Sequence, residues 1–290
     1  MEDKKPTIRS RTLGEAMRRA MESAGISGMW AAERLGCSQG HISRLLSGKR
    51  GASVEDVSSI LTLCGMPKGD ERSYLLSLCE DPHRPGWLQQ FGTRLPKQVS
   101  VLADHEDLAN YYADFQPVVI PGLLQTADYS RAVMLGNVNL PENEIEGRVS
   151  ARLVRAEVLS RLDPATFEFY VHEWVLRTMV GGRVVMCDQL HHLLRLGVRE
   201  NITIRVMSAS VGAYPAMSGP FMIMRFPQFR PVVYLESETS CLFLEEPPEI
   251  SAYENLLTGL RKTSLDEADS RAMITEFAAR LAADREDHDG

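Results

Sequence analysis

Residues 27–50, SGMWAAERLGCSQGHISRLLSGKR, constrain the fold more than any other part of this chain. Small and apolar side chains recur there at the spacing of two short helices that pack against one another. These side chains are Ala31, Ala32, Leu35, Ile42 and Leu45. Gly36 lies between the two groups, where a tight connection favours a residue that tolerates positive φ. Ser38 is placed to cap the second helix, which is expected to end at Ser47-Gly48. The segment therefore predicts a helix-turn-helix.

The outward side of the second helix is polar, and basic residues follow its end. Its exposed positions are expected to be Gln39, Gly40, His41, Ser43 and Arg44. Lys49 and Arg50 come next, where a DNA phosphate could lie. An ordinary hairpin of two helices explains the apolar spacing equally well, but it does not explain a polar face followed by Gly-Lys-Arg. We therefore predict that this segment binds double-stranded DNA.

The distribution of charge supports this prediction. The whole chain has a net charge of −7, which by itself disfavours DNA binding. Residues 1–54 carry ten basic and five acidic residues, a net charge of +5 that leaves −12 for the remainder. A basic N-terminal part on an acidic body confines phosphate attraction to one end of the chain. The body is expected to serve another purpose.

Composition limits the class of protein. A length of 290 residues allows two domains, and 44% hydrophobic with 24% charged residues is ordinary for a soluble protein. No apolar run is long enough to span a membrane or to act as a secretion signal, so we expect a cytoplasmic, nucleoid-associated protein. The five cysteines are scattered without a CxxC pair, which favours reduced thiols over disulfides or a structural zinc site. No cofactor is expected.

The chain is expected to divide into four parts. Residues 10–80 predict an all-α head of five helices, with a first helix at 12–24 and a fourth capped by Ser53. Residues 81–98 hold three prolines and two glycines and are expected to be a connector. Residues 99–284 form the body, and residues 285–290 form an acidic tail.

The body alternates between helical and strand-like patterns. Helices are expected at 101–113, 121–135, 142–161, 173–179, 183–197, 249–262 and 266–284. Strands are expected at 167–172, 201–207, 220–226, 231–236 and 240–244. This order predicts an α+β domain in which flanking helices cover a mixed sheet of four or five strands.

Motifs for catalysis are incomplete or missing. His172-Glu173 begins like a zinc-binding HExxH helix, but Leu176 occupies the position of the second histidine. His191 and His192 are adjacent on a helix, so their side chains point about 100° apart and do not face one metal ion. No phosphate-binding glycine loop or GxSxG motif is present. We expect neither an enzyme nor a metal site.

The segment PGLLQT at 121–126 has two interpretations. Pro121 suits the first turn of a helix, so the segment can be the start of a core helix. Alternatively it lines a pocket or partner surface. The candidate polar residues of that surface are Gln125, Tyr129, Arg152, Glu173 and Glu236.

Two family resemblances add to this interpretation. Residues 12–66 resemble the XRE (Cro/C1-type) DNA-binding domains. The body resembles the C-terminal domain of the actinobacterial WhiJ-type or Scr-type antitoxin-like regulators. The matching segments, in order, are QPVVIPGLLQTADYSRAVM at 116–134, RLVRAEVL at 152–159, HEWVLRTMVGG at 172–182, DQLHHLL at 188–194, NITIRVM at 201–207, GAYPAMSGPFMIMRF at 212–226 and VVYLE at 232–236. The resemblance implies a transcriptional regulator, commonly encoded beside a small partner protein.

In XRE domains the N-terminal face of the recognition helix reads the bases. By position, that role falls on Gln39, Gly40 and Arg44, with His41 and Ser43 flanking. Glutamine can bind adenine and arginine can bind guanine, each through two hydrogen bonds. The resemblance completes the candidate DNA-binding set. It consists of Ser27, Ser38, Gln39, Gly40, His41, Ser43, Arg44, Lys49 and Arg50.

This chain departs from the XRE pattern at several positions. Gly28 replaces a glutamine that often contacts phosphate, so Ser27 or backbone N–H groups must supply that contact if anything does. Gly40 replaces a long polar side chain. Met21 and Leu46 stand where the family often has an arginine–glutamate ion pair, so we expect a hydrophobic contact there.

Two functions remain open at this stage. The first is a dimeric, sequence-specific transcriptional regulator whose C-terminal domain senses a ligand or a small partner protein. The second is an antitoxin-like protein that neutralises a small partner, with DNA binding serving autoregulation. In either case we expect a homodimer.

Overall fold

The computed structural model describes residues 8–48, 52–77, 79, 102–103, 105–162, 164–227, 230–238 and 240–286. The chain divides into two compact units. The first contains residues 1–98, 226–231 and 237–245, and the second contains residues 99–225, 232–236 and 246–290. The predicted connector at 81–98, the tail from residue 287 on, and both Lys49 and Arg50 lie outside the described residues.

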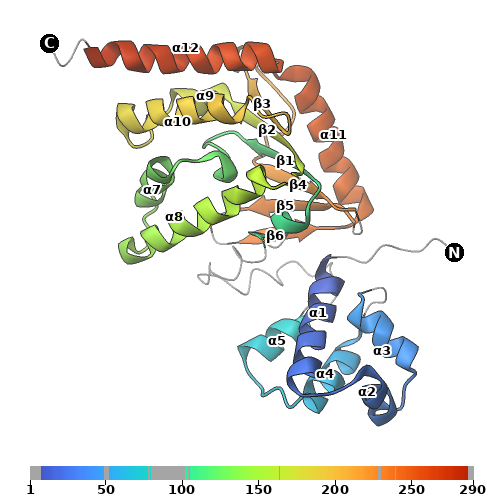
Figure 1. Ribbon diagram of the computed structural model, residues 1–290. Helices are drawn as coiled ribbons and strands as arrows, with labels where there is room; N and C mark the ends of the chain where they lie inside the picture. Colours follow the sequence, from blue (N-terminus) through green and yellow to red (C-terminus); the bar gives the residue numbers. More distant parts are fainter. Residues whose placement is uncertain are drawn as a thin grey trace. The chain divides into compact units, whose positions relative to one another are not determined.

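The helices of the first unit lie between residues 8 and 77 (Figure 1). Its helices are α1 (Ile8–Ser23), α2 (Gly28–Leu35), α3 (Gln39–Leu46), α4 (Val54–Leu63) and α5 (Asp70–Ser77). Serine caps begin three of them as expected, with Ser27, Ser38 and Ser53 each accepting a hydrogen bond from a backbone N–H three residues further on. Gly36 ends α2 with φ of 65°, the left-handed conformation that the turn requires. The main difference from the sequence prediction is that α1 begins earlier than residue 12.

One hydrophobic core joins the helices of this unit. It contains Leu13, Met17, Met21, Ala31, Ala32, Ile42, Leu45, Val57, Ile60, Leu61 and Leu75. The apolar positions of the helix-turn-helix segment thus belong to the same cluster as the inward face of α1. This shared core fixes the orientation of α3, the helix expected to read DNA.

Gly14 allows α1 to approach the end of α3 closely. A Cβ atom at this position would lie 2.5 Å from the carbonyl oxygen of Leu46 and 2.9 Å from its carbonyl carbon. Beside this contact, Arg18 Nη2 donates a hydrogen bond of 3.1 Å to the Leu46 carbonyl oxygen. Because the obstructing atoms belong to the backbone, the steric clash of an added Cβ atom can be relieved only if one of the two helices moves.

We therefore expect Gly14→Ala to destabilise the first unit by about 1 to 3 kcal/mol, the usual cost of overpacking. This loss should exceed any gain from the better helix propensity of alanine. Urea unfolding followed by circular dichroism measures the change. Gly147→Ala is the matched control, because that glycine lies within α8 (Glu142–Ala156) with no atom within 4 Å of an added Cβ. Equal stability of the Gly14→Ala variant and the wild type would refute the close approach.

A mixed sheet has the strand order β3-β2-β1-β4-β5-β6, and its strands β1 to β5 belong to the second unit. The strands are β1 (Tyr111–Gln116), β2 (Thr166–His172), β3 (Ile202–Met207), β4 (Phe221–Arg225), β5 (Val232–Glu236) and β6 (Cys241–Leu244). Pairing is parallel from β1 to β2 and from β2 to β3, and antiparallel from β1 to β4 and from β4 to β5. The parallel connections run through helices, as such crossovers must.

Helices connect and flank the strands. They are α7 (Ala127–Leu135), α8, α9 (Glu173–Arg177), α10 (Gly182–Leu196), α11 (Pro247–Thr263) and α12 (Glu267–Glu286). Short 3₁₀ turns occupy Gly122–Leu124, Glu157–Ser160 and Ala209–Val211. An α+β body is what the sequence predicts.

The two faces of the sheet pack against different helices, because successive strand residues point to opposite sides. Tyr111 faces α11, where Arg261 Nη2 donates to its hydroxyl oxygen at 2.6 Å. Tyr112 faces the other way, toward Phe167 and Phe169 of β2, with ring centroids 5.7 and 5.8 Å apart. In Figure 1, α8 and α11 accordingly lie on opposite sides of the sheet.

Three predictions for the body were wrong. The helix expected at 101–113 does not continue past residue 108, since β1 begins at Tyr111. The sheet has six strands among the described residues rather than four or five. PGLLQT does not begin an α-helix, because Gly122–Leu124 form a 3₁₀ turn and Thr126 caps α7. Gln189 stabilises the boundary between the 3₁₀ turn and α7. Its side chain accepts a hydrogen bond from Thr126 N–H and donates one to the Leu124 carbonyl oxygen, both at 2.7 Å.

Candidate nucleic-acid interface

Helix α3 separates a buried side from an exposed polar side. Ile42 and Leu45 are buried in the core of the first unit. Gln39, Gly40, Ser43 and Arg44 are exposed. Ser38 is also exposed, and its Oγ accepts from His41 N–H at 3.1 Å, which starts the helix at Gln39. A helix that presents only polar and small residues outward, from its first turn onward, is what a major groove can receive.

Gly40 affects the position of Arg44 on this surface. A Cβ atom at residue 40 would lie 3.4 Å from Nη1 of Arg44. The guanidinium group of Arg44 therefore lies back along the helix over Gly40, one turn earlier. Gly40 makes no side-chain contact of its own, but it leaves this space to the arginine.

His41 differs from its expected place on the exposed side. It is half-buried, and its Nε2 lies 3.3 Å from Oδ1 of Asp56 in the first turn of α4. This contact attaches α3 to the start of α4, so His41 positions the recognition helix. The sequence did not indicate Asp56 as this partner, although it is an acidic residue in the first turn of the helix, three residues after the cap Ser53.

Ser27 lies at the start of α2 and is exposed. Its Oγ accepts from Trp30 N–H at 3.2 Å, which leaves the hydroxyl hydrogen free to donate to a phosphate oxygen. Met21 and Leu46 belong to the same core, Met21 as a buried member and Leu46 packed against it from a partly buried position. A direct contact between these two side chains stays a prediction.

The structure divides the candidate residues of the body into two groups. Gln125, Tyr129 and Arg152 form the first group. Gln125 Nε2 donates to the Ile120 carbonyl oxygen at 2.7 Å, and the Tyr129 hydroxyl accepts from Ile120 N–H at 3.1 Å. Arg152 Nη1 donates to Gln125 Oε1 at 2.7 Å. Gln125 and Tyr129 are buried, and their hydrogen bonds to Ile120 fix the turn before α7.

Glu236 ends β5. Burial raises the pKa of its carboxyl group, and the positive charges of Arg155 and Arg152 oppose this effect. Arg155 also holds Glu106 in a buried pair, with Nε–Oε2 and Nη2–Oε1 distances of 2.8 and 2.7 Å. No local sequence pattern indicates this pair, because the two residues are 49 positions apart.

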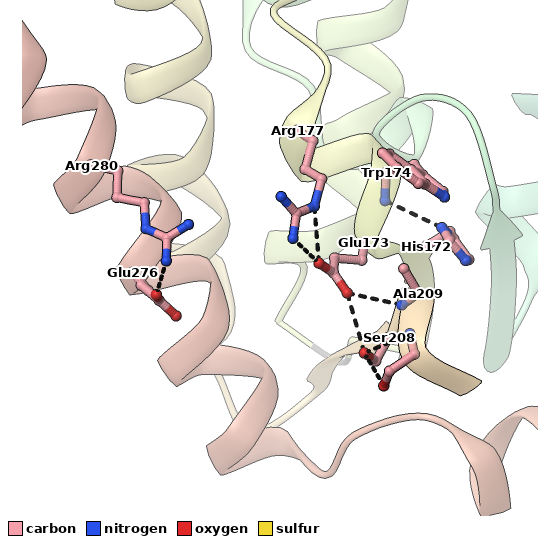
Figure 2. A network of polar contacts seen from close by, with 9 residues as sticks. His172, Glu173, Trp174, Arg177, Ser208, Ala209, Glu276 and Arg280 are labelled. Carbon is pink, nitrogen blue, oxygen red and sulfur yellow. Dashed lines mark hydrogen bonds and ion pairs between the residues drawn. The ribbon is translucent and has the colours of Figure 1, made fainter. Parts of the chain in front are cut away.

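Glu173 lies apart from this group, in the network that Figure 2 shows. Its Oε1 accepts from Arg177, one helical turn further along, and its Oε2 accepts from Ala209 N–H at 2.8 Å and from the Ser208 hydroxyl at 3.2 Å. Burial acts to raise the pKa of Glu173, but the hydrogen bonds from Ala209, Arg177 and Ser208 outweigh it and hold the pKa below its usual range. The carboxylate is therefore charged at neutral pH.

His172, just before it, caps α9, with Nδ1 accepting from Trp174 N–H at 3.2 Å. Burial lowers the pKa of His172, against the opposing effect of the Glu173 charge. Neutral imidazole with its proton on Nε2 satisfies this contact. Among the residues that the structure describes, no group of three or more His, Cys, Asp or Glu side chains is arranged to hold a metal ion.

Comparison with known families covers both units. Residues 99–276 match the family described as a domain of unknown function, DUF5753. The chain belongs to the DUF5753 family. In addition, residues 12–75 match a helix-turn-helix domain family, which supports a DNA-binding regulator. No curated protein and no solved structure matches the chain. None of the described helices of this DUF5753 protein is both long and apolar enough to cross a membrane.

Proposed function

We propose that this protein is a sequence-specific transcriptional regulator that binds DNA through α3 as an XRE-type homodimer. The observation that carries the proposal is the arrangement of α3, whose buried Ile42 and Leu45 fix an exposed face containing Gln39 and Arg44. The match of residues 12–75 to helix-turn-helix domains supports it independently. In a homodimer, two such helices about 34 Å apart would engage successive major grooves on one side of the duplex.

We propose further that the C-terminal domain regulates this binding and does not catalyse a reaction. In support, the two residues that resemble part of a catalytic motif have structural partners, since His172 caps α9 and Glu173 accepts from Ser208 and Ala209. We favour a small ligand as the signal. The WhiJ-type or Scr-type relationship and the antitoxin-like alternative stay predictions from the sequence resemblance.

Arg44→Ala should weaken specific DNA binding between about fivefold and 150-fold, the loss of one bidentate contact to guanine. The dependence of affinity on salt should remain steep, because phosphate contacts are retained. The measurement is fluorescence anisotropy of the full chain with a duplex selected from a random library.

Arg19→Ala is the matched control, since Arg19 is an exposed arginine on α1, outside the helix-turn-helix segment. We expect its affinity to stay within about twofold of the wild type. If Arg44→Ala bound the selected duplex as tightly as Arg19→Ala, base readout by Arg44 would be wrong. If the wild type selected no sequence at all, the proposed function would fail.

A further inference from the structure

A groove at one edge of the sheet has the features of a small-molecule site. It has a volume of about 560 Å³, within the usual range for ligand pockets. The side chains that line it come from α9, from the turn after β3 and from α12, among them Glu173, Arg177, Ser208, Met273, Phe277 and Arg280. We propose that this groove binds a small organic carboxylate with an apolar or aromatic body, and so provides the ligand site of the C-terminal domain. This inference rests on the regulatory role proposed above.

The position of the groove in the fold favours a ligand. Glu173 follows directly after β2, and Ser208 follows directly after β3. These strands are parallel neighbours, so their carboxyl ends lie at the same edge of the sheet. In open sheets with parallel strands, ligands commonly bind outside the carboxyl ends.

Arg177 is held in place by hydrogen bonds on one side of its guanidinium group, and the other side remains open to an anion. Glu173, whose side chain is only 8% exposed, receives hydrogen bonds from Nε and Nη2 of Arg177. Arg177 itself is 45% exposed, and its Nη1 has no hydrogen-bond partner among the residues that the structure describes. A guanidinium group that is fixed on one side and open on the other is suited to a planar carboxylate.

A second guanidinium group faces the same space. Arg177 on α9 and Arg280 on α12 both line the groove, and Figure 2 shows each guanidinium group directed at its own carboxylate partner. Arg280 binds Glu276, but both side chains of that pair are about 60% exposed, so the pair is weak and can rearrange around an anion. The two acidic residues of the lining, Glu173 and Glu276, are each paired with one of these arginines, and Glu173 also accepts from Ser208 and Ala209.

Phe277 supplies the apolar part of the site. The guanidinium carbons of Arg177 and Arg280 lie 5.0 and 5.7 Å from the centre of its ring, so both cations are arranged around one aromatic side chain. Met273 lines the groove on the same helix. A ligand that is charged at one end and apolar along its body matches this combination better than an inorganic anion or a neutral apolar molecule.

Isothermal titration calorimetry of the full chain tests the proposal, with 3-phenylpropionate and octanoate as probes. Acetate carries only the charge, 2-phenylethanol carries only the apolar body, and inorganic phosphate is a different anion. We expect saturable binding of at least one of the two probes at concentrations up to about 10 mM, and at least about tenfold weaker binding of the other three compounds. No saturable binding of either probe, or equal binding of acetate or phosphate, would overturn the proposal.

Arg280→Gln is the informative variant, because this exposed side chain can be changed without leaving a buried charge. It should weaken probe binding by about tenfold, the loss of one charge-assisted hydrogen bond. Arg195→Gln makes the same charge change at an exposed position on α10 outside the groove and should leave binding unchanged. Equal affinities of the two variants would contradict the assigned site.

DNA binding by the same protein samples, measured without probe, separates the two proposals. Probe binding without selective DNA binding would refute the proposed function and leave the carboxylate site standing. Selective DNA binding without probe binding would refute the carboxylate site and leave the proposed function standing.

Discussion

Arg155→Met is expected to destabilise the second unit by about 3 to 5 kcal/mol, a large part of the stability of an ordinary domain. The side chain of Glu106 is 0% exposed and that of Arg155 only 11% exposed, and two parallel hydrogen bonds join them. Removing the arginine leaves a carboxylate in the interior without its counter-charge. Urea unfolding of the full chain at about pH 7 measures the loss.

Two further variants show whether the loss comes from the unpaired charge. The double variant Glu106→Leu with Arg155→Met removes both charges and should recover most of the stability, because apolar replacement of a buried pair is often neutral. Arg148→Met, on the same helix, breaks a pair with Glu144, which is 47% exposed, and should cost less than about 1 kcal/mol. A double variant as unstable as Arg155→Met would show that packing, and not the buried charge, accounts for the loss.

Asp114→Asn is expected to change how stability depends on pH. Asp114 lies on the central strand β1, fully buried, with Gln116 Nε2 donating to its Oδ1 at 2.9 Å. Burial raises the pKa of Asp114 to about 7, with the charge of Glu106 adding to this effect and the hydrogen bond from Gln116 opposing it. In the unfolded chain the pKa is about 4.

The sign of the effect follows from these two pKa values. Below about pH 4 Asp114 is protonated in both the folded and the unfolded state, so it does not make the free energy of unfolding depend on pH. Between about pH 4 and pH 7 the unfolded chain releases this proton while the folded chain keeps it, so the wild type loses stability through this group as pH rises. Asparagine does not titrate, so the stability of Asp114→Asn relative to the wild type should increase by about 2 to 4 kcal/mol from about pH 4 to pH 8.

Denaturant unfolding at several pH values measures this difference, with Asp188→Asn as the control at an exposed position on α10. If the difference in free energy of unfolding between Asp114→Asn and the wild type stayed constant across that range, Asp114 would not be the group that keeps its proton in the folded state.

Local signals made the first unit predictable. Ser27, Ser38 and Ser53 begin helices and Gly36 turns the chain, and each acts through atoms within a few residues of itself. In the body, most helices and strands follow the hydrophobic pattern of their own segments for the same reason. Strand β1 was the exception, because Tyr111–Gln116 is short, central and buried on both faces, and contains the buried Asp114. Such a run has no clear period of two.

Contacts between distant segments could not be predicted. His41 and Asp56, Arg155 and Glu106, and the arginines around Phe277 come together only through tertiary packing. Gly14 gave no signal beyond being an isolated glycine in a helix, since its role depends on the carbonyl of Leu46, 32 residues later. Of the candidate ligand residues, Glu173 alone lines the groove proposed as the ligand site.

We propose that α3 reads bases in the major groove, with Arg44 bonded to a guanine. Methylation interference on the selected duplex tests this proposal, because methylation of guanine N7 blocks the atoms that an arginine contacts in that groove. We predict that methylation of a particular guanine in each half-site strongly weakens binding by the wild type, and that Arg44→Ala no longer responds to methylation at that position. Identical interference patterns for the wild type and Arg44→Ala would contradict it.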